Sequence, residues 1–140
     1  MSAAKHTLSF SLESDYTLLG ILSDEPGYRL CWQINRALKT DFRREDNLLL
    51  YHKKLKVDQQ IEYFSYHKAH SSYRLIKNAC EPGFFLDEMK NLDYFMHLEG
   101  DSPEKEIREL MNKLQTLSCI RMCVRIDKDE LKSGERFLLW

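Results

Sequence analysis

The chain has 140 residues, a formal net charge of −1 and a hydrophobic content of 43%. This length is typical of one domain with one core, and the balanced charge gives no overall attraction to nucleic acid or anionic lipid. No apolar run approaches the ~20 residues of a membrane span, so we expect a single domain over residues 1–140 that does not interact with a membrane.

The first half of the chain predicts strands at both ends of one helix. Alternating apolar and polar residues predict a strand over Lys5–Glu13. The segment 13–23 that follows predicts a short helical turn. Apolar residues at helical spacing predict a helix near Glu25–Lys39, with Pro26 among its start signals. Asn47–Tyr51 then predicts a second strand.

The second half predicts more strands and another helix. Residues favouring β-structure flank a polar turn near Lys68–Ser71, which indicates a hairpin. Leu92–Leu98 is the next predicted strand. Ser102 as N-cap and Pro103 as first residue begin the clearest helix, and alternation over Ile120–Ile126 predicts a closing strand.

This order of elements predicts an α+β fold. We expect an antiparallel-rich sheet of five to six strands, with two main helices packed on one face and a β-α-β unit at the end. No repeat, low-complexity tract or linker divides the chain, which again indicates one domain.

The residue types that most often carry metal or redox chemistry are scattered. No Cys-x-x-Cys pair occurs, and apolar neighbours surround all four cysteines: Cys31, Cys80, Cys119 and Cys123. His67 and His70 fall at the predicted hairpin tip, where their spacing is a weak metal signal. No nucleophile elbow, phosphate-binding glycine loop or dinucleotide fingerprint is present. We therefore expect a reduced cytoplasmic protein that is not an enzyme and has no disulfide, metal or cofactor.

An acidic stretch, "FFLDEMKNLDYF" over Phe84–Phe95, could be read in two ways. Its carboxylates could do acid–base chemistry or hold a metal. However, the loop contains no histidine, and no second acidic motif is spaced to complete a ligand set. Ordinary strand patterning follows from Leu92 onward, so we interpret the carboxylates as structural.

Part of this stretch, "LDEMKNLDY", resembles the signature of the bacterial IPExxxVDY family. Asp87 stands where that family has proline. The helix segment Tyr28–Leu38 is also similar, and the resemblance covers nearly the whole chain. It implies no activity, cofactor or catalytic residue. The positions that match the signature or depart from it conservatively are Leu86, Glu88, Leu92, Asp93 and Tyr94.

The two signature carboxylates, Glu88 and Asp93, need partners if they hold a turn. A carboxylate in a turn can accept backbone N–H groups or pair with a part-buried arginine. Arg29 and Arg74, each in a Tyr-Arg-Leu sequence, are the candidate arginines. We expect the carboxylates to stabilise the turn by one of these routes.

Charge is unevenly distributed along the chain. Residues 29–56 contain eight basic and three acidic residues, a net +5, whereas residues 81–110 contain nine acidic and three basic residues, a net −6. This asymmetry suggests a surface that attracts an acidic partner, although two solvated faces of a neutral domain would look the same. The candidate surface comprises Arg36, Lys39, Arg43, Arg44, Lys53, Lys54 and Lys56.

We predict a non-catalytic, protein-binding adaptor or regulatory domain, whose partner is another protein or a second copy of itself. One alternative is a small-molecule-sensing regulatory domain, by analogy of fold alone. Another is an RNA-associated protein that uses the basic 29–56 segment. Aromatic residues on the predicted hairpin could stack bases or simply pack across strands: Tyr63, Phe64, Tyr66 and Tyr73.

The chain ends in a large apolar cluster, Phe137–Trp140. Such an ending either packs on its own domain or serves as a docking peptide. We expect self-packing, because Gly134 can turn the chain back toward the sheet.

Overall fold

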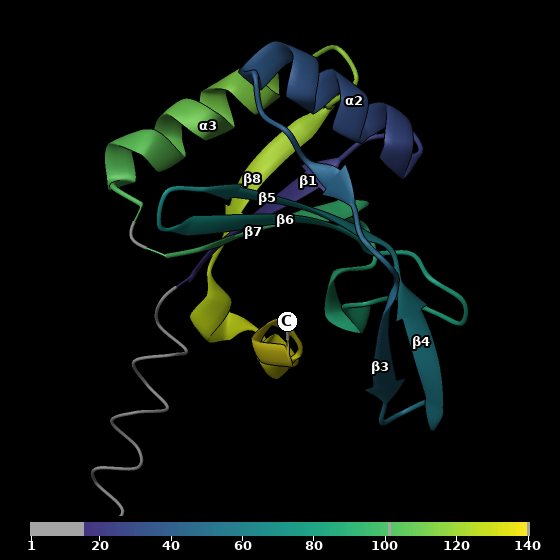
Figure 1. Cartoon of the computed structure of the whole chain (residues 1–140). Coiled ribbons are helices and arrows are strands. Elements are labelled where there is room, and N and C mark those ends of the chain that lie inside the picture. The colour runs from purple at the N-terminus through teal and green to yellow at the C-terminus, as the bar shows by residue number, and fades with distance from the viewer. Residues whose placement is uncertain (1–15, 101, 140) are drawn as a thin grey trace, which may run out of the picture.

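The computed structural model describes residues 16–100 and 102–139 (Figure 1). The strand expected over Lys5–Glu13 lies outside the described residues. The main sheet has six strands in the order β2-β5-β6-β7-β1-β8, and each neighbouring pair is antiparallel. These features confirm the α+β class and the antiparallel-rich sheet.

The observed strands follow most of the predicted ones. β5 and β6 form the expected hairpin, with Lys68 opposite Ser71. β3 (Leu48–His52) and β4 (Val57–Ile61) form a separate two-stranded sheet, so the strand predicted at Asn47–Tyr51 has a partner that the sequence did not predict. The six strands of the main sheet are β1 (Tyr16–Leu22), β2 (Arg43–Arg44), β5 (Tyr63–Lys68), β6 (Ser71–Lys77), β7 (Tyr94–Glu99) and β8 (Met122–Ile126).

Both predicted helices are present and cover the same face of the sheet (Figure 1). They are α2 (Gly27–Leu38) and α3 (Glu104–Thr116). Pro26 and Pro103 each stand at the N-cap, just before the first helical residue. The missing N–H of proline costs no helical hydrogen bond at a helix start. α3 therefore begins one residue later than its sequence predicted.

The expected β-α-β unit is also present. β7 and β8 both run antiparallel to β1, which lies between them, so β7 and β8 are parallel to each other. α3 connects these two strands, as a parallel pair requires. Two short 3-10 segments follow, η2 (Lys128–Glu130) and η3 (Gly134–Leu139).

The helical turn predicted over residues 13–23 is wrong, because most of that segment is β1. Leu19 and Ile21 belong to the core beneath the helices, whereas Leu18 belongs to the core on the other face of the sheet. A strand covered on both faces is apolar almost throughout, so it lacks the period-two alternation that identifies a half-exposed strand.

Two apolar cores cover the two faces of the sheet. The first lies beneath the helices and includes Leu30, Ile34, Leu75, Met96, Ile107 and Leu114. The second lies on the opposite face, beneath the loop that contains η1 (Asp87–Met89), the β3–β4 hairpin and the C-terminal segment (Figure 1). It includes Leu50, Ile61, Ile76, Phe85, Phe95 and Phe137.

The C-terminal segment packs on its own domain at Phe137, as expected. The ring of Phe137 is buried and lies 5.0 Å from the ring of Phe85 and 5.9 Å from that of Phe95, centroid to centroid. The side chains of residues 138–140 lie outside the described part of the chain. The second core therefore includes one residue of the C-terminal segment, Phe137.

Candidate functional site

The signature residues lie where the loop before β7 meets the rest of the domain. Leu86 and Leu92 are buried in the second core. Tyr94 is buried in the first core, and its hydroxyl donates a hydrogen bond of 2.6 Å to the carbonyl of Glu25. Burial raises the pKa of the Tyr94 phenol, so it stays a neutral donor. These three side chains are therefore part of the packed interior.

Both signature carboxylates accept backbone N–H groups from remote segments. One oxygen of Asp93 accepts from the N–H of Ser23 at 2.8 Å. The two oxygens of Glu88 accept from the N–H groups of Lys132 and Ser133 at 3.0 and 2.7 Å. Asp93 thus connects the loop to the chain after β1, and Glu88 connects it to the C-terminal segment.

The arginine partners proposed from the sequence are wrong. Arg29 pairs with Glu25, one helical turn away, at 3.1 Å. Arg74 lies 3.6 Å from Glu99 on the neighbouring strand. Each arginine therefore has a nearer carboxylate, which its sequence context did not indicate.

The residue that organises the loop, Asn78, was missed. It is fully buried, and its amide nitrogen donates to the carbonyls of Met89 and Leu92 at 2.8 and 2.9 Å. Its amide oxygen accepts from the N–H of Leu86 at 2.9 Å. A single asparagine preceding a turn carries no sequence signal that distinguishes this role from an ordinary turn residue.

A histidine–aspartate pair joins the same loop to the β3–β4 hairpin. The backbone N–H of Leu55 donates to Nδ1 of His52 at 3.0 Å, so the other ring nitrogen carries the proton. That nitrogen, Nε2, donates to the carboxylate of Asp87 at 2.6 Å. The IPExxxVDY signature has proline at the position of Asp87. In this chain the hydrogen bond from His52 to the Asp87 carboxylate holds the turn instead.

The seven basic residues of the candidate surface do not form one patch. Arg36 and Lys39 lie at the end of α2, whereas Lys53, Lys54 and Lys56 lie at the tip of the β3–β4 hairpin. Figure 1 shows α2 and this tip at opposite ends of the molecule. The basic residues of β2 are partly engaged, since Arg43 pairs with Asp41 and Arg44 bonds to Asn47 just before β3.

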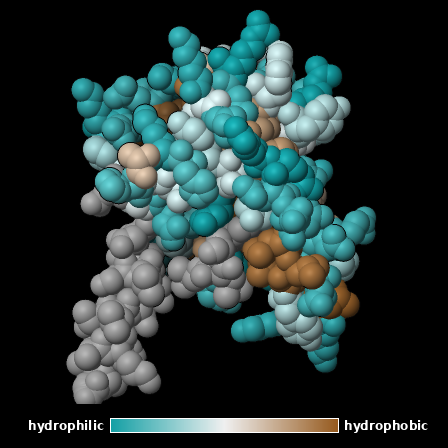
Figure 2. All heavy atoms as spheres, in the orientation of Figure 1, coloured by the Kyte–Doolittle hydropathy of each residue, from teal (hydrophilic) through white to brown (hydrophobic). Residues whose placement is uncertain are grey.

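The outer face of the hairpin also exposes two neighbouring apolar side chains, which we call the hairpin patch. Leu49 and Tyr51, which form this patch, are 63% and 57% exposed and lie on the side of β3 opposite to buried Leu50 and His52. Leu55 and Val57 are 45% and 40% exposed but lie on the inner side of the hairpin, because Val57 pairs with His52 and Leu55 lies beside Gly83. Figure 2 shows the apolar side chains gathered over the β3–β4 hairpin, with hydrophilic residues around them.

The aromatic residues considered for base stacking do not lie on an open sheet face. Phe64 is buried, and Tyr63, Tyr66 and Tyr73 are half-buried against the two cores. Helices cover one face of the sheet and loops cover the other, so successive bases have no exposed row of rings to stack on.

Burial raises the pKa of each cysteine thiol in the described chain. All four thiols are free, and burial raises the pKa of Cys31 and Cys123 to about 11, which keeps them protonated at neutral pH. Among the residues that the structure describes, no three Cys, His, Asp or Glu side chains come together as metal ligands. Nor is any helix in this part of the chain long and apolar enough to cross a membrane.

His97 is buried on β7 without a hydrogen-bond partner on either ring nitrogen within the described structure. Its ring stacks on that of Phe137 at 5.4 Å and lies 4.7 Å from that of Tyr16. Burial, together with the positive charges of Arg74 and Lys128, lowers the pKa of His97 to about 3. The imidazole is therefore neutral in the folded protein.

This burial predicts a loss of stability in acid. An unfolded histidine takes up a proton below pH ~6.5, while folded His97 excludes it down to about pH 3, so protons favour unfolding between those values. We expect His97→Gln to flatten the pH dependence of the unfolding free energy between pH 6 and 4 by about 1.4 kcal/mol per pH unit. Urea unfolding at several pH values measures this, with exposed His67→Gln as the control. An equal slope in parent and His97→Gln contradicts the prediction.

A comparison of the chain with protein-family models, with curated proteins and with solved structures finds no match. Membership of the IPExxxVDY family therefore stays a prediction from the signature residues.

Proposed function

We propose that the chain is a non-catalytic protein-binding domain that docks an acidic partner on the β3–β4 hairpin. The observation that supports this most strongly is the hairpin patch itself. Monomeric proteins seldom expose neighbouring large apolar side chains without a use for them, and aromatic residues such as Tyr51 are enriched at interfaces.

The hairpin is held in place from its inner face. Leu50 and Ile61 insert into the second core, and buried Gln59 donates to the carbonyls of Pro82 and Phe84 at 2.7 and 3.1 Å. A surface that is already ordered loses little conformational freedom on binding, which favours affinity.

The outer edge of β4 is available for pairing. Within the described part of the chain, β3 pairs only with β4 and β4 only with β3. On β3 the carbonyl of Tyr51 already accepts from Arg136 at 3.3 Å, so the backbone groups on the far side of β4 are the ones that can bond to an extended segment of a partner, as in β-strand addition.

Charge at the hairpin tip selects the kind of partner. The side chains of Lys53, Lys54 and Lys56 are exposed, and no described residue pairs with any of them. Basic residues around an apolar patch accelerate association with an acidic surface and disfavour a basic one. The proposed partner is thus an acidic segment with apolar side chains, on another protein or on a second copy of this chain.

Site-specific photo-crosslinking in the native cells tests the proposal. A photo-reactive phenylalanine analogue at Tyr51 should yield a discrete adduct, and Lys53→Glu, Lys54→Glu and Lys56→Glu together should abolish it while leaving the urea midpoint unchanged. The same analogue at Tyr28, which is exposed on α2, is the control and should not yield that adduct.

Two results would contradict docking at the hairpin. One is an identical adduct from both positions, which indicates non-specific contact. The other is a Tyr51 adduct that survives the triple charge reversal, because the tip lysines would then not contribute to recognition.

A further inference from the structure

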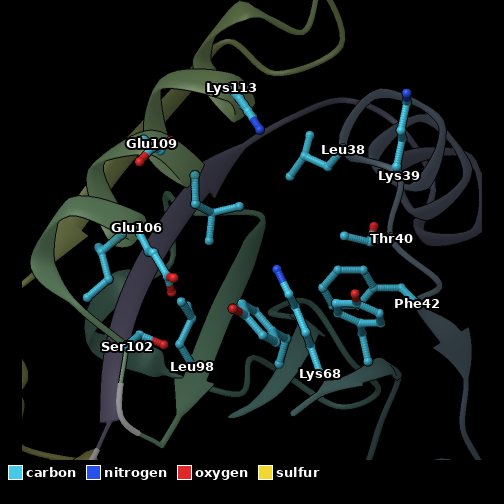
Figure 3. Close-up of a pocket in the computed structure, with 14 residues that line it drawn as sticks. Leu38, Lys39, Thr40, Phe42, Lys68, Leu98, Ser102, Glu106, Glu109 and Lys113 are labelled. Atoms are coloured by element: carbon cyan, nitrogen blue, oxygen red, sulfur yellow. The ribbon is translucent and has the colours of Figure 1, made fainter. Parts of the chain in front are cut away.

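We infer that a groove between α2 and α3 binds a small organic anion with a flat ring. The groove lies on the helix-covered face of the sheet, opposite to the β3–β4 hairpin, and its volume is about 330 Å³. A cavity of this size is within the range of small-molecule sites, roughly 300–1,000 Å³. Figure 3 shows it open between the end of α2 and the length of α3.

One side of the groove is built from three aromatic rings. The ring of Tyr66 lies 5.3 Å from that of Phe42 and 5.5 Å from that of Tyr73, centroid to centroid. Such a cluster offers flat apolar surface to a ring of the ligand, with preferred offset or edge-on contacts. The two tyrosine hydroxyls make no hydrogen bond within the described residues, so both are available to a ligand.

The aromatic side is fixed rather than loosely placed. The N–H of Phe42 donates to the amide oxygen of Asn35 at 2.8 Å, and its carbonyl accepts from the amide nitrogen of the same residue at 3.0 Å. Asn35 lies on α2, so these two bonds hold Phe42 against the helix. A site with preset walls binds without reordering them.

The charged residues of the groove indicate that the ligand is an anion. Lys68 and Lys113 point into the space from β5 and α3, whereas Lys39 points away from it (Figure 3). Neither Lys68 nor Lys113 has an acidic partner among the described residues. Two unpaired ammonium groups beside a ring surface suit one carboxylate, sulfonate or phosphate group on the ligand.

The acidic residues of the groove limit the charge of that ligand. Glu106 also points into the space from α3, and Glu109 lies one turn further along the helix (Figure 3). A second anionic group near Glu106 would be repelled, whereas an N–H or O–H donor would be accepted. The inferred ligand therefore carries one anionic group, a flat ring body and hydrogen-bond donors.

A pair of fluorescent probes tests the inference on the whole chain. Anilinonaphthalene sulfonate has flat rings and one anionic group, and N-phenylnaphthylamine has similar rings without the charge. We expect the double variant Lys68→Gln with Lys113→Gln to bind the sulfonate roughly tenfold or more weakly, because a single charge-assisted hydrogen bond already contributes about a factor of ten in affinity. Binding of the neutral probe should change by less than about twofold.

Matched variants decide whether the groove is the binding site. Lys53→Gln with Lys54→Gln removes the same charge from the hairpin tip, and Leu49→Ser reduces the hairpin patch; neither should change the affinity for the sulfonate. Glu106→Gln should increase that affinity, because it removes the nearest negative charge. Tyr66→Ala should weaken binding of both probes.

The inference is overturned if the groove lysine variant binds the sulfonate as the parent does, or if the hairpin variants lose as much affinity. Weaker sulfonate binding by Glu106→Gln would likewise overturn the assignment of the ligand as an anion.

Discussion

Replacing Phe137 with alanine is expected to lower the free energy of unfolding by about 3–5 kcal/mol. The ring is 2% exposed and packs among four other rings, those of Tyr16, Phe85, Phe95 and His97. Removing the ring would lose its buried apolar surface. It would also leave a cavity, because the side chains packed on this face of the sheet cannot move far enough to fill the space. Urea unfolding monitored by circular dichroism measures the change.

Deletion of Arg136–Trp140 should have at least the same effect. It also removes the guanidinium of Arg136, which donates to the amide oxygen of Gln59 at 2.5 Å and to the carbonyl of Tyr51 at 3.3 Å. Glu135→Ala, an exposed change in the same segment, is the control and should leave the urea midpoint unchanged. A deletion variant that unfolds at the parent midpoint would show that the chain end is no part of the core.

The second large effect is expected at Asn78. Asn78→Ala would leave the N–H of Leu86 and the carbonyls of Met89 and Leu92 without their partner in the interior. Each unsatisfied buried group costs about 1–3 kcal/mol, so we expect a loss of at least ~3 kcal/mol in unfolding free energy.

Asn78→Asp separates this role from simple packing. An aspartate can still accept from the N–H of Leu86, but as a carboxylate it faces two carbonyl oxygens. Relative to the parent at the same pH, we expect severe destabilisation at neutral pH and a smaller one near pH 4, where the protonated acid can donate to one carbonyl. Asn91→Asp, an exposed change in the same loop, is the control. If Asn78→Asp is destabilised relative to the parent by the same amount at both pH values, the hydrogen-bonding role is contradicted.

The elements predicted correctly are those whose signals are local. Helical spacing and an initial proline identify α2 and α3, and a polar turn between β-favouring residues identifies the β5–β6 hairpin. β1 was missed because its two covered faces remove the alternation on which the prediction rests. The strand β4 was not separated from the β5–β6 hairpin, because residues 59–68 follow one another as a single stretch in the sequence and only Glu62 divides β4 from β5.

The candidate site was predictable only in part, for a similar reason. The sequence indicated that Glu88 and Asp93 would accept hydrogen bonds, since a carboxylate in a turn usually does. It could not indicate Ser23, Lys132 or Ser133 as donors, because their backbone N–H groups come close only in the folded chain. A run of basic residues in the sequence likewise became two separate surfaces, because α2 and the β3–β4 hairpin lead to opposite ends of the molecule.

The position of β1 between β7 and β8 also bears on how the protein is synthesised. β1 leaves the ribosome early, but its first partner, β7, begins roughly 70 residues after β1 ends. At roughly 5–20 residues per second, an apolar strand waits several seconds without either neighbour. Phe137, which is translated after β7 and β8, then closes the face that it shares with Phe95 and His97. During that interval the nascent chain exposes β1 to chaperones and to other unfolded chains. We therefore expect aggregation during translation to begin at β1.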